Sequence, residues 1–159
     1  MSGPLDGLRG IAVTESPSAA YAAVLFALLG ADVVSIAVEP GADEGVDLLR
    51  SLLPEADFVL EDCARRVLGE AGLDVEGTRA AHPSAVWCAI TSRKDEVRAD
   101  VTSAWQAVAG VLLALHHRVA VGVAQRIDLD LRTLKVAATA EGLPATLPLT
   151  FVPTTVESS

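Results

Sequence analysis

The chain has 159 residues, of which 51% are hydrophobic and only 4% aromatic, and it carries a formal net charge of −9. This length is typical of one domain with one core, which Ala, Val and Leu must build here. The negative charge disfavours a nucleic-acid partner, because phosphates demand a basic surface. Residues 19–29 are too few to cross a bilayer and residues 1–10 lack a secretion signal, so we expect a cytoplasmic protein without membrane binding.

The two cysteines indicate no special chemistry. Cys63 and Cys88 are far apart in the sequence and form neither a Cys-x-x-Cys pair nor a ligand cluster with the three histidines. We therefore expect reduced, buried thiols and no metal site.

Short apolar runs alternate with helix-like segments along the chain. In the first unit, Ser16 or its neighbour is expected to cap a helix that starts at Pro17 and ends at Gly30. We expect strands at residues 10–14, 32–38, 56–60, 85–91 and 126–131. We expect helices at residues 17–29, 43–53, 63–71, 75–81, 101–118 and 132–140, and a polar surface loop at 92–98.

This alternation predicts an α/β fold. Strand, helix and strand with short links form a unit that is parallel and right-handed in nearly all cases. Residues 1–143 are expected to form a single compact domain, a Rossmann-like, mostly parallel sheet flanked by helices. Residues 144–159 contain scattered Pro and Thr and are expected to form an extended, partly flexible C-terminal arm.

Ligands of such sheets bind beyond the carboxyl ends of the strands. No Gly-x-Gly-x-x-Gly follows the first strand, and no Gly-x-x-x-x-Gly-Lys-Ser/Thr occurs in the chain. Dinucleotides and nucleoside triphosphates are therefore disfavoured as ligands.

Several segments, taken in order, resemble the family III CoA-transferases, the CaiB/BaiF family. They are PLDGLRGIAV, LLGADVVSI, EADFVLEDCARRVLGEAGLD, HPSAVWCAIT, and GVLLALHHR followed by GVAQRIDLDL. The likeness extends to about Leu131, and it depends on the order and spacing of these segments rather than on any one of them.

The resemblance implies a role for Asp100. In that family an aspartate near the start of the long helix attacks an acyl-CoA, forming an acyl anhydride and then a thioester with CoA. Asp100 falls on this position by its spacing to Gly110, Arg118 and Gln125. A carboxylate can attack a thioester carbonyl, but an Asp directly before a helix is also a common N-cap. Both roles stay open from the sequence.

The resemblance also implies a place for CoA. Ser18 in the first loop, and Arg65 and Arg66 after the third strand, are the expected CoA-binding residues. The two arginines would meet phosphates at a helix N-terminus, or they are solvated surface charges.

The sequence also departs from the family. The segment SRKDEVRA, residues 92–99, stands where the family has a glycine-rich loop and a substrate-lining segment, and Ala19-Ala20 replace a Gly-Pro pair. The family's small domain has no counterpart. These departures predict a truncated and diverged relative.

Three functions follow as hypotheses. The first is a subunit without transferase activity of its own, with no required cofactor, that pairs with itself or with a full-length relative. The second is an enzyme acting on acyl-CoA or a related thioester, with Asp100 as nucleophile or base. The third is new small-molecule chemistry by the strand-end carboxylates Glu15, Glu61 and Asp62, of which the last two are equally explained as strand-end and capping groups.

Overall fold

The computed structural model describes residues 3–38, 43–62, 64–91, 101–130 and 149–153, and among these the side chains of 64–66, 102 and 149–153 are not described. The strands are β1 (Arg9–Val13), β2 (Asp32–Ile36), β3 (Phe58–Glu61), β4 (Val86–Thr91), β5 (Gln125–Asp130) and β6 (Leu149–Pro153). The helices are α1 (Pro17–Leu28), α2 (Asp43–Leu52), a short 3-10 turn at Leu53–Glu55, α3 (Ala64–Glu70), α4 (Val75–Ala81) and α5 (Val101–Val121).

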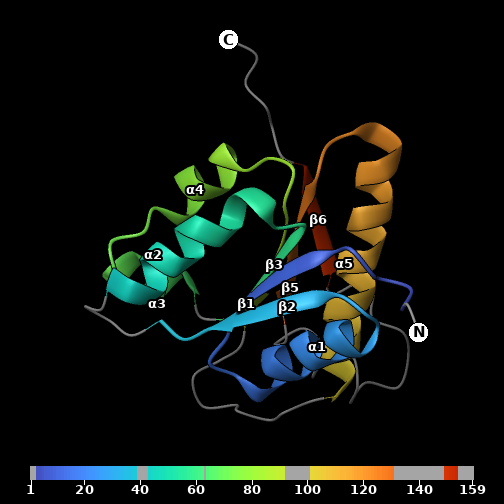
Figure 1. The fold of residues 1–159 in the computed structure, drawn as a ribbon, viewed down its shortest axis with the longest axis horizontal. Coiled ribbons are helices and arrows are strands. Elements are labelled where there is room, and N and C mark those ends of the chain that lie inside the picture. The colour runs from blue at the N-terminus through green and yellow to red at the C-terminus, as the bar shows by residue number, and fades with distance from the viewer. Residues whose placement is uncertain (1–2, 39–42, 63, 92–100, 131–148, 154–159) are drawn as a thin grey trace.

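The strands form one sheet in the order β2-β1-β3-β4-β5-β6, in which β1 to β5 are parallel (Figure 1). The predicted α/β class, with a mostly parallel sheet, is confirmed. The sixth strand is a difference from the sequence-based expectation. Leu149–Pro153 belongs to the predicted C-terminal arm, but it pairs antiparallel with β5, with Leu149 opposite Leu129. The expected helix at 132–140 and the loop at 92–98 lie outside the described residues.

Helices cover both faces of the sheet. α1 and α5 pack together on one face, over a core that includes Phe26, Phe58 and Val111. α2, α3 and α4 cover the other face, over a core that includes Leu49, Val59 and Trp87 (Figure 1). Each face therefore has its own apolar layer between sheet and helices.

The connection through α5 differs in hand from the other crossovers. The chain moves from β4 to β5 in the same direction across the sheet as from β3 to β4, yet α5 lies on the opposite face from α3 and α4. Parallel crossovers are right-handed in nearly all proteins, and that rule would place α5 beside α4. On the face of α4, β5 carries the polar side chains Arg126 and Asp128, which pair with each other at 2.6 Å, and Arg126 also pairs with Glu76 of α4 at 3.2 Å.

The start of the first unit forms as its sequence predicts. Ser16 is the N-cap of α1 and accepts a hydrogen bond from the backbone N–H of Ala19, with Pro17 at the first helical position. Gly10 on β1 lies under the ring of Phe58, which a Cβ atom at position 10 would overlap. Phe58 in turn packs on Phe26, with ring centroids 4.4 Å apart. The glycine thus allows the two rings to sit between the sheet and α1.

Asp57 joins four elements at the amino end of the sheet. Its carboxylate accepts hydrogen bonds from the backbone N–H of Arg9 at 2.9 Å and from Nη2 of Arg118, near the end of α5, at 2.7 Å. Its own carbonyl accepts from the N–H of Val86 at the start of β4, at 2.9 Å. Arg118 also donates to the carbonyl of Ser84 at 2.8 Å. The Asp57 and Arg118 side chains are only 24% and 20% exposed, so each charge is partly removed from water and is stabilised by the opposite charge of its partner.

We expect Arg118→Ala to lower the free energy of unfolding by about 2–3 kcal/mol, because it removes the charged donor to Oδ1 of the partly buried Asp57 carboxylate, which keeps only the backbone N–H of Arg9. Urea unfolding measures this loss. The matched control is Arg50→Ala, which removes an exposed i, i+3 pair with Asp47 and should cost less than about 0.5 kcal/mol. Equal losses for the two variants would contradict the structural role of Arg118.

Candidate functional site

The carboxyl edge of the sheet has the geometry expected of a ligand site in this class of fold. β2 and β3 lie on either side of β1, so the order in which strands are added along the sheet reverses between β1 and β3. Ligands of doubly wound sheets bind at such reversal points. Here the loop after β1 and the residue after β3 are held together by Asp62. Its carboxylate accepts from the backbone N–H groups of Glu15 at 2.9 Å and Ser16 at 2.5 Å.

The structure places three of the predicted site residues near this edge. Ser18 lies in the first turn of α1, but it is only 3% exposed, so its side chain faces into the protein. Arg65 and Arg66 lie in α3, which begins just beyond Asp62, and their side chains are not among those described. CoA binding by these three residues remains a prediction. Asp100 lies outside the described residues, and its role as cap or nucleophile is untested.

The strand-end carboxylates of the third hypothesis have different surroundings. Glu61 ends β3 and is 5% exposed. Asp62 uses both carboxylate oxygens to accept backbone N–H groups of the loop after β1, and so bridges the ends of two neighbouring strands. A carboxylate engaged in this way positions the loop and is poorly placed to exchange protons with a ligand.

Cys88, in the middle of β4, is a free and fully buried thiol, as the sequence predicts. Burial in the apolar core raises the pKa of this thiol far above its ordinary value, and the negative charges of Glu61 and Asp128 raise it further. The thiolate is the reactive form of cysteine. Cys88 is therefore a core residue and does not act as a nucleophile at neutral pH.

The described part of the chain shows neither a cluster of metal ligands nor a membrane-spanning helix. No group of three or more His, Cys, Asp or Glu side chains is arranged to hold a metal ion there. Among the same residues, no helix has the length and apolar character needed to cross a membrane.

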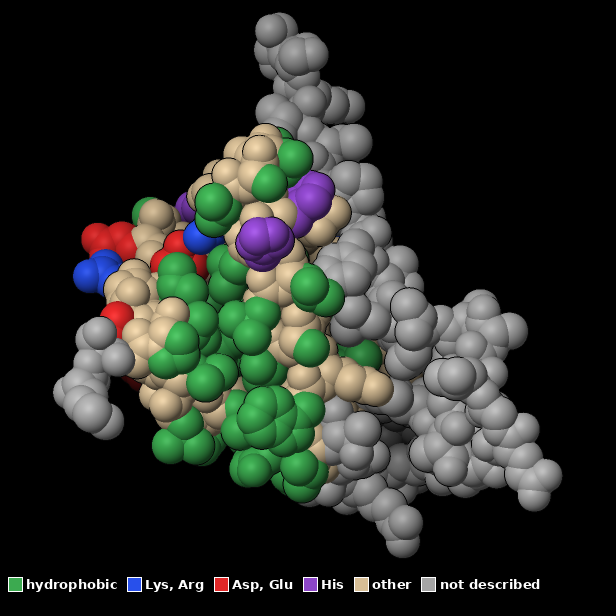
Figure 2. Space-filling view, turned by 90° about the vertical axis from the view of Figure 1, so that its right-hand side faces the viewer, with side chains coloured by type: hydrophobic (Ala, Val, Ile, Leu, Met, Phe, Trp, Pro, Cys, Tyr) green, Lys and Arg blue, Asp and Glu red, His purple; other side chains and the backbone are tan. Residues whose placement is uncertain are grey.

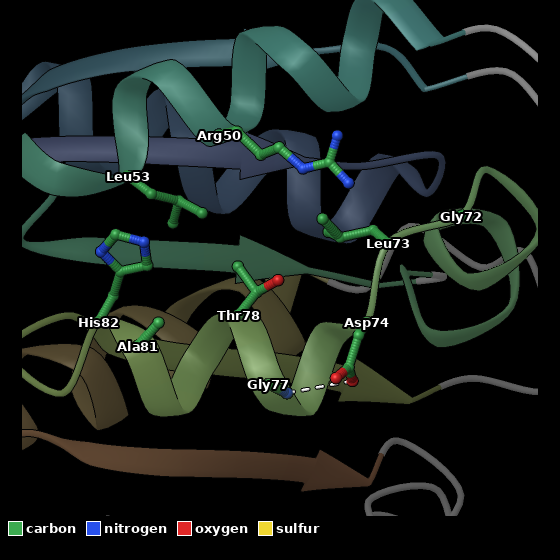
Figure 3. A pocket seen from close by; sticks show the side chains of 9 residues that line it. All are labelled: Arg50, Leu53, Gly72, Leu73, Asp74, Gly77, Thr78, Ala81 and His82. Carbon is green, nitrogen blue, oxygen red and sulfur yellow. Dashed lines mark hydrogen bonds between the residues drawn. The ribbon is translucent and has the colours of Figure 1, made fainter.

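A groove of about 420 Å³ lies elsewhere, between α2 and α4 (Figure 3). Leu53 and Leu73 form apolar walls, Thr78 faces in from α4, and Arg50 extends along the groove from α2. The carboxylate in its lining, Asp74, already caps α4 through the N–H of Gly77 at 3.1 Å. The lining includes none of the predicted CoA-binding or catalytic residues, so the groove is separate from the expected site.

The structure also shows an apolar surface that the sequence-based site residues do not include. α1 exposes Tyr21, Val24 and Leu28, and α5 exposes Trp105 and Leu113. We call this surface, which also includes Val101, the α1/α5 face, and Figure 2 shows its hydrophobic side chains gathered over the two helices. The sequence feature that indicates this face is a lack of charged residues over most of both helices. Residues 16–31 and 101–117 contain no Asp, Glu, Lys or Arg, in a chain with 21% charged residues.

The comparisons with known proteins agree with the fold. No family model matches the chain. It is 26% identical over 128 residues to the succinate–glutarate CoA-transferase of Agrobacterium fabrum, an alignment that covers 55% of this chain and 32% of that protein.

Two solved structures are similar over most of the chain. Protein Rv3272 of Mycobacterium tuberculosis has a TM-score of 0.72 at 18% identity, covering 86% of this chain and 56% of that one. A CaiB/BaiF family protein of Brucella suis has a TM-score of 0.68 at 19% identity, covering 91% of this chain and 60% of that one.

These likenesses show that the chain has the α/β scaffold found in these proteins, and they relate it to the CaiB/BaiF-like, family III CoA-transferases. The resemblance expected from the sequence motifs is thereby confirmed. The chain spans 32% of the curated relative and less than two thirds of the two solved chains.

We expect the raised pKa of Cys88 to make stability depend on pH. The folded thiol stays protonated above its ordinary pKa of 9.0, whereas the unfolded thiol ionises there. The free energy of unfolding should therefore fall as the pH rises past 9.0, and Cys88→Ala should lack this part of the fall. Urea unfolding of both proteins from about pH 8 to about pH 10 measures the difference between their slopes. Parallel curves would contradict the expectation.

Proposed function

We propose that this chain, a CoA-transferase-like scaffold, acts as a partner subunit and has no transferase activity of its own. The observation that carries the proposal is the α1/α5 face. Leu28 is 77% exposed and Trp105 is 50% exposed, on neighbouring helices of one layer. Large apolar side chains gathered on one face of a protein are typical of a surface that binds another protein.

The composition of the α1/α5 face supports this role. The centres of protein interfaces are depleted in charged residues and enriched in aromatic ones. The face contains Tyr21 and Trp105, and neither helix carries an Asp, Glu, Lys or Arg before Arg118. Arg118 does not contribute charge to this face, because its guanidinium is bound to Asp57.

The state of the carboxyl edge supports the absence of independent catalysis. Both carboxylate oxygens of Asp62 accept backbone N–H groups, and Glu61 is buried. An acyl anhydride also needs a site that excludes water, because an exposed activated acyl group hydrolyses.

We expect the purified chain not to transfer CoA from succinyl-CoA to glutarate, the acids that appear in the name of the curated relative. We also expect CoA, at concentrations well above micromolar, to leave its melting temperature unchanged, because only a ligand that binds the folded state raises it. A full-length family III CoA-transferase in the same assays is the positive control. Turnover by the purified chain would contradict the proposal.

A second candidate function is chemistry on an acyl-CoA thioester, and the reversal point between β1 and β3 favours it. In this reaction a carboxylate oxygen of Asp100 attacks the thioester carbonyl carbon, the C–S bond breaks, and CoA leaves as the thiolate. The product is a mixed anhydride on Asp100, which a second acid or the returning thiolate can open.

Mass spectrometry distinguishes this candidate from the partner role. After incubation with succinyl-CoA, hydroxylamine converts an anhydride or thioester of a carboxylate into a hydroxamate that survives digestion. The enzyme hypothesis predicts a hydroxamate at Asp100, which the Asp100→Ala variant lacks. Asp95→Ala, in the same segment, is the matched control and should still form it. A peptide containing unmodified Asp100 supports the partner role.

A further inference from the structure

We infer that the groove between α2 and α4 binds a small organic acid, in which one carboxylate is joined to an apolar body of a few carbon atoms. The groove has a volume of about 420 Å³, which is within the range of small-molecule sites. It lies on the opposite side of the sheet from the α1/α5 face, so the inference is independent of the proposed partner role.

The walls of the groove favour an apolar body in the ligand. Leu53 and Leu73 are 1% and 4% exposed, and they belong to the apolar core beneath α2 and α4. Ala81 extends this lining along α4. A hydrocarbon chain that lies against these side chains leaves water, and the free energy gained grows with the apolar area that is buried.

Arg50 provides the positive charge of the site. Its Nη1 donates to Asp47 at 3.2 Å, in a pair whose side chains are 53% and 70% exposed. Such exposed pairs contribute little to stability, and Arg50 has no other acceptor within the described part of the chain. The edge of the guanidinium formed by Nε and Nη2 is therefore available to a ligand. A carboxylate can accept two parallel hydrogen bonds from such an edge.

The charges at the groove favour a monocarboxylate over other classes of ligand. The carboxylate of Asp74 points away from Arg50 and caps α4 through the N–H of Gly77 (Figure 3). An uncharged ligand would cover the guanidinium without replacing the water bound to it. A phosphate with two charges would meet a single guanidinium in a chain with a net charge of −9. One carboxylate matches the one charge of Arg50.

Thr78 supplies a second polar contact for the acid. Its side chain is partly buried and faces into the groove from α4, across from Arg50 on α2 (Figure 3). Among the described residues its hydroxyl has no hydrogen-bond partner. A hydroxyl can donate to a carboxylate oxygen. The two helices therefore place two donors, one of them charged, on the same apolar groove.

Amide NMR spectra of the isotope-labelled chain, recorded during a titration with hexanoate, test the inference. The shifts should saturate and should centre on Arg50 and residues 72–82. We expect a Kd on the order of 1 mM, because the ligand is small and the groove is open on one side. Hexanol has the same carbon chain without the charge and should bind at least about tenfold more weakly.

Arg50→Gln removes the charge from the groove and should weaken hexanoate binding about tenfold. The matched control is Arg9→Gln. Arg9 is also an exposed arginine, 56% accessible and paired with Glu55, but it lies on β1 and does not line the groove. Its substitution changes the net charge of the chain equally and should leave the binding as it is. Circular dichroism checks that both variants are folded.

Three results would each overturn the inference. They are shifts that do not saturate or that centre on the α1/α5 face, equal binding of hexanol and hexanoate, and equal binding by the Arg50→Gln and Arg9→Gln variants. The transfer assay with succinyl-CoA and the melting temperature with CoA test the proposed function without this groove. Failure of the inference and failure of the proposed function are therefore distinguishable.

Discussion

The structure depends on the hydrogen bonds of Asp57 at the amino end of the sheet. This carboxylate holds the start of β1 through the N–H of Arg9, and it holds the last part of α5 through Arg118. The backbone of Asp57 simultaneously pairs with Arg9 and Val86, on the strands to either side of β3. One residue therefore sets the relative position of three strands and the longest helix. The partial burial of the ion pair makes each partner costly to remove alone.

The two edges of the sheet consequently serve different purposes. Several residues of the family-like motifs, Gly10, Asp57 and Arg118 among them, lie at the amino edge or in the core and maintain the scaffold. The fold is similar to those of two solved structures at less than 20% identity. The chemistry of such sheets takes place at the carboxyl edge, where the motif around β3 contributes Glu61, which is buried, and Asp62, which is bound to backbone N–H groups. Likeness at the scaffold therefore carries little information about activity.

The sequence predicted the elements that have a strong local pattern. β1 to β4 are apolar runs bounded by turn residues, β5 alternates polar and apolar residues, and α1 has Ser16, Pro17 and Gly30 at its ends. β6 could not be predicted, because Leu149–Pro153 reads as an extended segment and its pairing depends on the free edge of β5. The face of the sheet that α5 covers could not be predicted either, because the right-handed rule for parallel crossovers favours the opposite face. Asp62 was expected as a capping group, but its partners lie 46 and 47 residues away in the sequence.

The position of α5 has a consequence for how the protein folds. A sheet built only from crossovers of one hand can grow strand by strand, with each helix covering the strands it connects. Here the layer that contains α1 is completed by a helix from the distant end of the described chain. Contacts between such remote segments form slowly, because the intervening chain must be ordered first. During synthesis α1 emerges well before α5, so the buried side of α1, with Phe26, stays exposed to solvent until α5 has been made. Chaperones protect exposed apolar surfaces of this kind.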